Sequence, residues 1–267
     1  MALDDAARQG QAVFDDWLAG LRQLYEVITA QTPEVVLVDE PEPVRAWTES
    51  AAKRWQPDAW SRHACDLTLE NDPVPRKQAW VTTTQVNFCA LAFPSVVSGH
   101  PDQAALLVLG HYLRNAWLHR VIREQGGAYG GGATQDSGAG VFKFYSYRDP
   151  RLGDTLDDFR RAIDWVCSSP VDPDALEEAI LGVISGLDKP RSPAGEALGV
   201  HQERLFGRTD AYVEGLRQQV LGTTAEDLRR VAETWLANGE AAEAVVTSEA
   251  GAASLAARGF ERFELNG

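Results

Sequence analysis

The segment from Gly126 to Gly140 is the part of the sequence with the most unusual chemistry, because seven of its fifteen residues are glycine. Its first part reads GGAYGGG and places Tyr129 between two groups of glycines. A phosphate-binding loop is excluded, since the run matches neither G-x-x-x-x-G-K-S/T nor G-x-G-x-x-G and follows the negative end of a predicted helix. Glycine lets another backbone approach closely. The run therefore indicates a surface that faces a peptide, or a helix cap followed by a hairpin.

The five histidines do not form a recognisable metal-binding motif. Neither H-E-x-x-H nor H-x-x-E-H occurs, and His111 and His119 are eight residues apart on one predicted helix, too far to share a zinc ion. His63 and Cys65 are close enough to bind a metal together, but the sequence offers no second pair. We expect no metal site in this chain and a structural or surface role for all five histidines: His63, His100, His111, His119 and His201.

No other motif of a self-contained active site is present. The nucleophile motif G-x-S-x-G is absent, and the three cysteines, Cys65, Cys89 and Cys167, form no C-x-x-C pair. Their odd number and wide spacing argue against a disulfide framework and fit a reducing compartment or buried thiols, which leaves the localisation open. Adjacent carboxylates such as Asp157 and Asp158 point to different faces of a predicted helix and indicate solvated surface.

The composition restricts the class of protein. The chain of 267 residues carries 25 Lys and Arg against 39 Asp and Glu, so its net charge is −14 and it lacks the basic surface that nucleic acids require. The uncharged stretch 79–101 is long enough for a membrane span, but its Thr, Gln, Asn and Ser residues indicate strand and loop. With 44% hydrophobic residues, the chain is predicted to fold around a packed core.

The two ends of the chain share an order of predicted elements. Apolar spacing near the N-terminus predicts a helix over 4–30, a strand over 35–38 and a helix over 44–55. The same order is predicted near the C-terminus, over 223–237, 244–247 and 250–258.

This similarity suggests that residues 1–65 are the tail of a preceding, related domain and that residues 66–267 form the following one. Met1 is the only methionine, and a helix is predicted almost at once after it. We therefore expect a piece of a longer protein, with any targeting segment upstream.

The central part of the sequence predicts an α+β fold. We expect one or two strands in 79–92, a long buried helix from Pro101 to about Glu124, and a strand over 141–147 whose alternate residues face the core. Asp172 and Thr223 are predicted helix N-caps. Further helices are predicted near 155–167, 172–188, 194–206 and 210–220, and a last extended piece over 260–265. This order favours helices packed on one face of a mostly antiparallel sheet.

Several segments resemble one family of enzymes. The run YLRNAWLHRVIREQGGAYGGGA from Tyr112 to Ala133, together with FKFYSYRDP from Phe142 to Pro150, is similar to the C-terminal region of presequence proteases. These enzymes belong to the insulysin/pitrilysin superfamily of zinc peptidases. The stretches 79–87 and 177–193 support the resemblance, which covers roughly residues 79 to 267.

The resemblance implies how the chain is used. In that superfamily, four related α+β domains form two halves that enclose a chamber, and the zinc site H-x-x-E-H lies in the first domain. This chain matches the fourth domain and the end of the third. It is therefore expected to be inactive alone and to act with a zinc-bearing N-terminal catalytic half of the same polypeptide, on short unstructured peptides. The net negative charge would either favour basic peptides by long-range attraction or serve only to keep the protein in solution.

The resemblance also implies a role for two side chains. Arg123 and Tyr129 match an Arg and a Tyr that the last domain supplies to the distant active site, where both can donate hydrogen bonds to a substrate carbonyl. Without the resemblance, Arg123 would stabilise a helix C-terminus and Tyr129 would pack in a hairpin. The expected substrate-binding glycines are Gly126, Gly127, Gly130, Gly131 and Gly132. Without side chains, they would let the two halves of the enzyme close around an extended peptide. The alternative is a structural or assembly domain with no proteolytic role.

Overall fold

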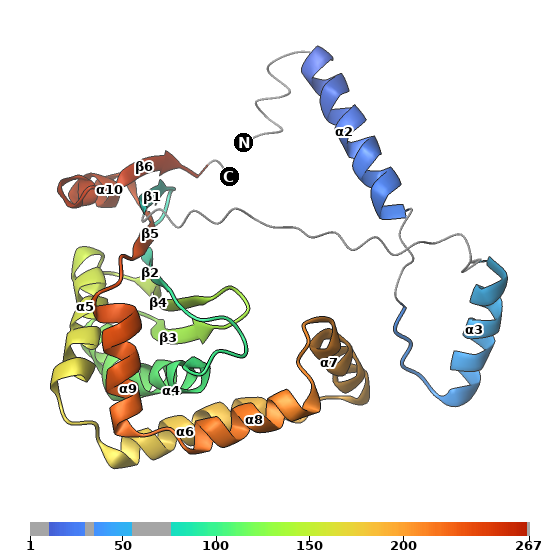
Figure 1. Cartoon of the computed structure of the whole chain (residues 1–267). Coiled ribbons are helices and arrows are strands. Elements are labelled where there is room, and N and C mark those ends of the chain that lie inside the picture. The colour runs from blue at the N-terminus through green and yellow to red at the C-terminus, as the bar shows by residue number, and fades with distance from the viewer. Residues whose placement is uncertain (1–10, 30–34, 55–75, 266–267) are drawn as a thin grey trace. The chain divides into compact units, whose positions relative to one another are not determined.

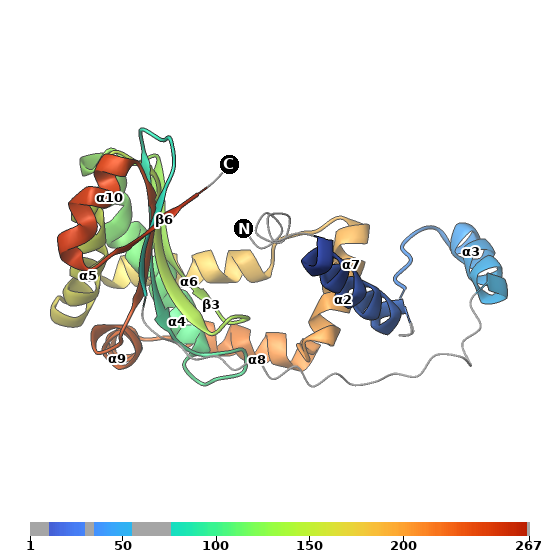
Figure 2. The same cartoon turned by 90° about the horizontal axis from the view of Figure 1, so that it is seen from above.

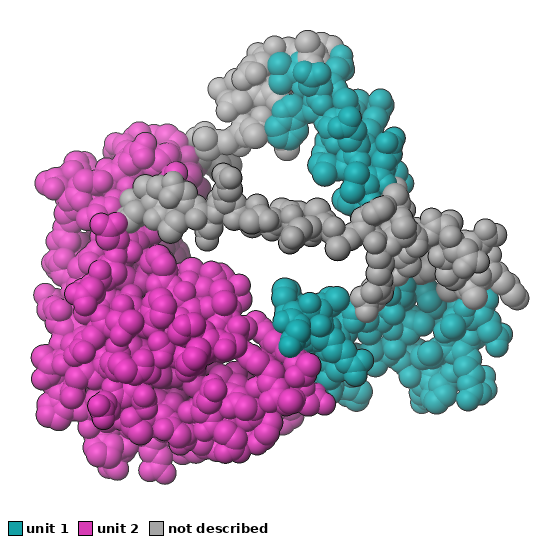
Figure 3. Space-filling view, viewed as in Figure 1, with its two compact units in different colours: residues 1–70, 191–207 teal, residues 71–190, 208–267 magenta. Residues whose placement is uncertain are grey.

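The computed structural model describes residues 11–29, 35–54 and 76–265. The chain separates into two compact units, one formed by residues 1–70 and 191–207 and the other by residues 71–190 and 208–267 (Figure 3). The second unit contains the sheet and the glycine-rich segment. The predicted boundary at residue 65 falls outside the described residues, so the assignment of residues 1–65 to a preceding domain stays a prediction.

The first unit contains three helices among its described residues: α2 (Gln11–Thr29), α3 (Pro41–Arg54) and α7 (Pro193–Leu205). These helices confirm the three predictions made for their segments. The strand predicted over 35–38 is wrong, because these residues adopt no regular structure. A strand needs a neighbour that pairs with its N–H and C=O groups, and the strand pairings of the described residues include none for 35–38.

A six-stranded sheet forms the centre of the second unit (Figure 1). Its strands are β1 (Lys77–Val81), β2 (Asn87–Pro94), β3 (Gly130–Asp136), β4 (Val141–Asp149), β5 (Ala242–Thr247) and β6 (Glu261–Glu264). In the order β3-β4-β2-β5-β1-β6, the pairs β3–β4, β4–β2 and β2–β5 are antiparallel, whereas β1 lies parallel to β5 and β6. The predicted α+β fold with a mostly antiparallel sheet is therefore confirmed.

One face of the sheet carries the core. On β2, Leu91 lies opposite Phe144 of β4, and both side chains are buried. The predicted alternation along β4 is confirmed, since Phe142, Phe144 and Ser146 are buried and the residues between them are not. Figure 2 shows α5 and α10 together on one side of the sheet. Because side chains alternate along a strand, one buried face is the pattern expected when helices cover one side.

The helices of the second unit follow the predicted order. They are α4 (Gln103–Leu113), η2 (Arg114–Gln125), α5 (Gly153–Ser168), α6 (Pro173–Leu187), α8 (Asp210–Leu221), α9 (Ala225–Ala232), η3 (Glu233–Ala237), α10 (Glu249–Leu255) and η4 (Ala256–Arg258). The predicted N-cap Asp172 is confirmed, because its side chain accepts a hydrogen bond from the Asp174 backbone N–H at 3.1 Å.

The long helix predicted from Pro101 to about Glu124 is present but changes its geometry halfway. It is α-helical as α4 and π-helical as η2. Leu106, Leu109 and Leu113 are buried on α4, and Leu118 and Ile122 continue the buried side on η2. A π-helical turn is wider than an α-helical one. The side chains of η2 therefore follow a spacing that α-helical periodicity does not predict.

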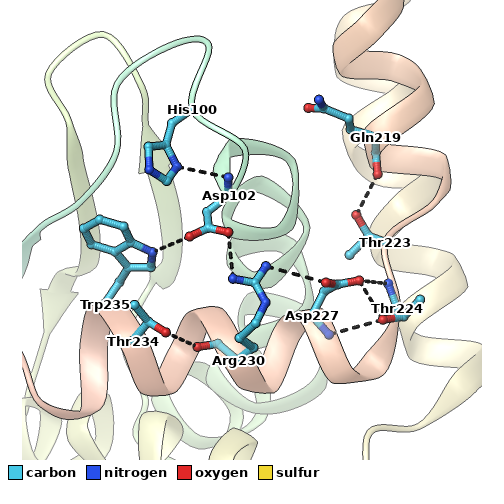
Figure 4. Close-up of polar contacts among 9 residues, drawn as sticks. All are labelled: His100, Asp102, Gln219, Thr223, Thr224, Asp227, Arg230, Thr234 and Trp235. Atoms are coloured by element: carbon cyan, nitrogen blue, oxygen red, sulfur yellow. Dashed lines mark hydrogen bonds and ion pairs between the residues drawn. The ribbon is translucent and has the colours of Figure 1, made fainter.

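A polar network anchors the N-terminal end of this helix (Figure 4). The Asp102 carboxylate accepts a hydrogen bond from Arg230 Nη1 at 2.7 Å and another from Trp235 Nε1 at 3.0 Å. The Asp102 backbone N–H donates to His100 Nδ1 at 3.0 Å. Burial alone raises the pKa of Asp102, but the hydrogen bonds from Trp235 and Arg230 outweigh it and leave the pKa below its ordinary value. The network joins the start of α4 to α9 and η3.

The N-cap of α9 is Thr224, one residue after the predicted Thr223 (Figure 4). Thr224 and Asp227 form the reciprocal capping box, in place of the predicted Thr223 and Glu226. The hydroxyl of Thr223 instead donates to the Gln219 carbonyl at 3.0 Å. Thr223 therefore serves the end of α8, and its neighbour begins α9.

Candidate functional site

Arg123 and Tyr129 lie on one short segment at the C-terminal end of η2. Gly126 caps the helix, and the backbone N–H of Gly127 donates to the Arg123 carbonyl at 3.0 Å. The next N–H, from Ala128, donates to the Ile122 carbonyl at 3.1 Å. These bonds close the helix and place Tyr129 directly before β3. The structure thus brings the two predicted side chains to the same end of the helix, with no hydrogen bond between them among the described contacts.

Two of the glycines shape this turn. Gly127 has a φ of +79°, a left-handed conformation that side chains rarely adopt. Gly126 has an ordinary φ, but a Cβ there would lie 2.5 Å from the Ile122 carbonyl oxygen and would collide with the Arg151 guanidinium. Gly126 is therefore required by packing inside this chain. Gly127 is exposed, and Gly126 is buried.

The prediction that Gly130, Gly131 and Gly132 belong to a loop is wrong, because these residues begin the edge strand β3. The alternative interpretation, a helix cap followed by a hairpin, is confirmed by the antiparallel pairing of β3 with β4. A Cβ on Gly130 would lie 2.6 Å from the Tyr147 ring, and one on Gly131 would lie 2.9 Å from Ile122 Cγ2. The absence of side chains lets η2 and β4 pack tightly against β3. Glycine density predicts a loop because glycine weakens a strand, but pairing with β4 and close packing outweigh that tendency here.

Tyr129 is well exposed, at 65%, and contacts two residues of β4 that sequence reasoning did not select. The Tyr147 ring centroid lies 5.6 Å from that of Tyr129, and the Arg148 guanidinium lies 5.7 Å from the Tyr129 centroid. The Tyr129 backbone N–H also donates to the Arg148 carbonyl at 3.3 Å. Both residues belong to the stretch YSYRDP, which the sequence analysis included in the resemblance to presequence proteases, so that resemblance could have pointed to them.

Arg123 is exposed and has no carboxylate partner among the described residues. Its Nη1 donates to His119 Nε2 at 3.2 Å, and His119 Nδ1 lies 3.4 Å from a Glu124 carboxylate oxygen. Within the described chain, Arg120 and Arg148 likewise lack an ion pair and lie over aromatic rings. In a chain with a net charge of −14, the exposed Arg123 guanidinium has further N–H groups that can donate to an acceptor at this end of η2, whereas Arg120 packs over Trp117.

Buried polar groups hold the turn that follows β4. Asp149 is fully buried, and its carboxylate accepts hydrogen bonds from Thr155 Oγ1 at 2.8 Å and from the Arg151 N–H at 2.9 Å. Arg151 pairs with Asp158 at 3.0 Å and donates to the Val121 carbonyl of η2 at 3.3 Å. The prediction that Asp158 lies on the solvated surface is wrong, because Arg151 and Arg161 neutralise it in a buried position. This cluster fixes the end of η2 relative to β4.

The described residues do not fit a metal site. In the parts of the chain that the structure describes, no three His, Cys, Asp or Glu side chains come together in a way that could hold an ion. His63 and Cys65 lie outside those parts. Cys89 packs in the core, where burial raises the pKa of its thiol to about 12, so its thiolate is not populated near neutral pH. Of the described helices, none combines the length and apolar character needed to cross a bilayer.

Comparison with known sequences identifies relatives of this region. Residues 77–249 match the family model of the PreP C-terminal domain. The mitochondrial presequence protease of Eremothecium gossypii is 36% identical over 219 residues, which are 81% of this chain and 21% of that protein. The enzyme of Yarrowia lipolytica is 39% identical over 154 residues, which are 58% of this chain and 15% of that protein. The chain therefore spans only about a fifth, or less, of these relatives.

Solved structures show the same fold at lower sequence identity. A protease from Helicobacter pylori superposes with a TM-score of 0.62 at 15% identity, covering 79% of this chain and 53% of that one. A peptidase M16 inactive domain from Pseudomonas fluorescens superposes with a TM-score of 0.58 at 16% identity, covering 76% and 51% of the two chains. At these identities, both likenesses support the fold alone. The chain belongs to the family of presequence protease C-terminal domains.

Proposed function

We propose that this chain is the non-catalytic, substrate-binding C-terminal part of a zinc endopeptidase that degrades short unstructured peptides. It supplies Arg123 and Tyr129 to an active site in the N-terminal catalytic half. One observation carries this proposal: an exposed arginine with no carboxylate partner in the described part of the chain and an exposed tyrosine share one turn, in the region that matches the family. A purely structural domain has no need to keep both of these donors at the surface.

The chemistry of the two side chains suits this role. The Arg123 guanidinium and the Tyr129 hydroxyl both donate hydrogen bonds, so they can bind a substrate carbonyl oxygen and stabilise the negative charge that develops on it. The zinc ion, bound by the catalytic half, would supply the activated water. The contribution of this chain is to hold two donors on a segment that the end of η2 and the turn after β4 fix in place.

The glycines contribute unequally to peptide binding in this proposal. Gly127 is exposed, and Gly130 and Gly131 are half-buried, so a peptide can approach the backbone there. Gly126 and Gly132 are buried, so their backbone is less accessible to a peptide. Peptide contact is therefore assigned to Gly127, Gly130 and Gly131.

The test measures cleavage of a quenched-fluorescent, unstructured peptide in the presence of zinc. It compares this chain, a matching zinc-bearing N-terminal half, and their mixture, together with mixtures that contain Arg123→Ala or Tyr129→Phe. Arg120→Ala is the matched control, because Arg120 is exposed on the same helix and lies over Trp117. We expect cleavage only in the mixture, lost in both variants and kept in the control.

Two outcomes would overturn the proposal. If the mixture assembles and both variants cleave like the parent, Arg123 and Tyr129 do not serve the reaction and a structural or assembly role is favoured. If this chain cleaves the peptide alone, it is not the non-catalytic part. Assembly is followed separately by analytical ultracentrifugation, so that a variant that fails to bind the catalytic half is recognised.

A further inference from the structure

Arg148 adopts a backbone conformation that its side chain disfavours. Its φ is +49°, and among the described residues it is the one non-glycine residue with a positive φ. A residue other than Gly, Asn or Asp in the left-handed region is strained. Such strain persists only where the surroundings impose it, and it gathers at functional sites.

The residues on both sides of Arg148 are fixed. Before it, Tyr147 pairs with Gly130 of β3. After it, the buried Asp149 carboxylate accepts hydrogen bonds from Thr155 and from the Arg151 N–H, and Asn87 Nδ2 donates to the Asp149 and Arg151 carbonyls at 3.1 Å each. Between Ser146 and Asp149, the pairing of β4 with β2 shifts register, because three steps along β4 match two along β2. Arg148 lies within this irregular stretch of β4.

In this conformation, the backbone carbonyl and the guanidinium of Arg148 both contact Tyr129. Its carbonyl accepts the Tyr129 N–H at 3.3 Å, and its guanidinium lies 5.7 Å from the Tyr129 ring centroid. A cation above an aromatic ring is attracted by the negative face of that ring. Within the described chain, the other aromatic ring that contacts Tyr129 is that of Tyr147, and Tyr129 is mostly exposed, so few other contacts restrain its ring.

We propose that Arg148 is a positioning residue, whose left-handed backbone and guanidinium together orient the Tyr129 side chain toward the substrate. This inference rests on the proposed function of Tyr129 and adds a residue that does not itself need to touch the peptide. The absence of a carboxylate partner for Arg148 within the described chain is consistent with this role, since an ion pair would draw the guanidinium away from the ring.

The experiment replaces Arg148 by Asn, which tolerates the left-handed region and lacks the cation. Arg120→Asn is the matched control, because the Arg120 guanidinium lies 5.9 Å from the Trp117 ring centroid at a position without backbone strain. The readouts are the aromatic ¹H–¹³C signals of Tyr129 in this chain, assigned with Tyr129→Phe, the thermal midpoint, and kcat and KM of the mixture with the catalytic half.

We expect Arg148→Asn to retain or raise the thermal midpoint and to shift the Tyr129 ring signals. It should lower kcat about two- to fivefold with little change in KM, the factor that an exposed cation–π contact is worth. Arg148→Lys, which keeps the charge, should recover part of the loss. Arg120→Asn should leave the Tyr129 signals and kcat unchanged.

Unchanged Tyr129 ring signals in Arg148→Asn would overturn the proposal whatever the activity. Shifted signals with parental kcat, in a mixture that loses activity on Tyr129→Phe, would also overturn it. A mixture that does not need Tyr129 refutes the proposed function instead, and the ring signals then decide alone whether Arg148 orients Tyr129.

Discussion

The two ends of the helix formed by α4 and η2 differ in whether their charged side chains have partners of opposite charge. At the N-terminal end, the Asp102 carboxylate is satisfied by Arg230 and Trp235, and the arginine in turn contacts Asp227 (Figure 4). At the C-terminal end, Arg123 and Arg148 lack carboxylate partners within the described chain, and Tyr129 is exposed.

This difference distinguishes charged groups whose interactions stabilise the fold from charged groups that can still bind another molecule. A paired group at the start of α4 joins elements that are distant in sequence, so its interactions are already used for folding. Unpaired donors at the end of η2 add little to folding, and they remain able to bind an acceptor from outside the chain. Beneath them, the buried cluster around Asp149 supplies the rigidity that exposed donors cannot provide for themselves.

The largest effect is expected from the unpaired donors and should appear in catalysis alone. In the mixture with the catalytic half, Tyr129→Phe or Arg123→Ala should lower kcat by about 10²- to 10³-fold, the range for loss of one donor to a developing oxyanion. Because both side chains are exposed, the unfolding free energy of this chain should change by less than about 0.5 kcal/mol. Peptide cleavage and urea unfolding of the same preparations check both statements. A parallel loss of stability would contradict the comparison.

The next effect is expected from the buried support below these donors. Asp149→Ala should lower the free energy of unfolding by about 3 kcal/mol, because the buried donors of Thr155 and Arg151 would lose a charged acceptor. Urea denaturation followed by circular dichroism measures the change. Asp157→Ala is the control, since Asp157 pairs with Arg258 at a more exposed position. Equal losses in the two variants would show that the buried cluster has no special role.

A smaller effect with a defined pH dependence is expected at the paired end. Asp102→Ala should destabilise the chain by about 1.5 kcal/mol at neutral pH through the loss of hydrogen bonds from Arg230 and Trp235. Because its folded-state pKa is lowered, Asp102 contributes stability above its ordinary pKa, and this contribution is lost as the pH falls through the lowered value. The difference between parent and variant should therefore shrink in acid. Urea unfolding between neutral and acidic pH tests this, and a constant difference would refute it.

The smallest effect distinguishes neighbouring threonines. Thr224→Ala should lower the free energy of unfolding by about 1 kcal/mol, because it removes the N-cap of α9. Thr223→Ala should cost less, since its hydroxyl only donates to a carbonyl that ends α8. Thermal unfolding of both variants ranks them. A larger loss of stability for Thr223→Ala than for Thr224→Ala would instead support Thr223 as the N-cap, as the sequence alone predicts.

Local patterns in the sequence predicted much of the fold. Helical spacing identified α2 and α4 to α8, and alternation along β4 identified its buried face, because both signals repeat within a few residues. The candidate site residues could not be predicted from such local patterns. Arg123 and Tyr129 were selected through the resemblance to presequence proteases, since nothing in their spacing distinguishes them from a helix end and a hairpin residue.

Long-range contacts decided the features that the sequence did not predict. The glycine run forms β3 because β4 pairs with it, and Asp158 is buried because Arg151 and Arg161 neutralise it. The strand expected over 35–38 lacks a pairing partner in the described sheet. In each case the outcome depends on a partner that local spacing does not specify.

The sequence by itself determined where helices and strands arise and which of their faces are apolar, because those properties depend on the period of neighbouring residues. Tertiary structure alone decided that Arg148 adopts a left-handed conformation beside Tyr129 and that Arg230 satisfies Asp102 across 128 residues. Backbone strain and the pairing of charges depend on which distant groups meet. In this protein, those meetings distinguish arginines that pair with carboxylates, such as Arg230, from Arg123 and Arg148, which have no carboxylate partner among the described residues.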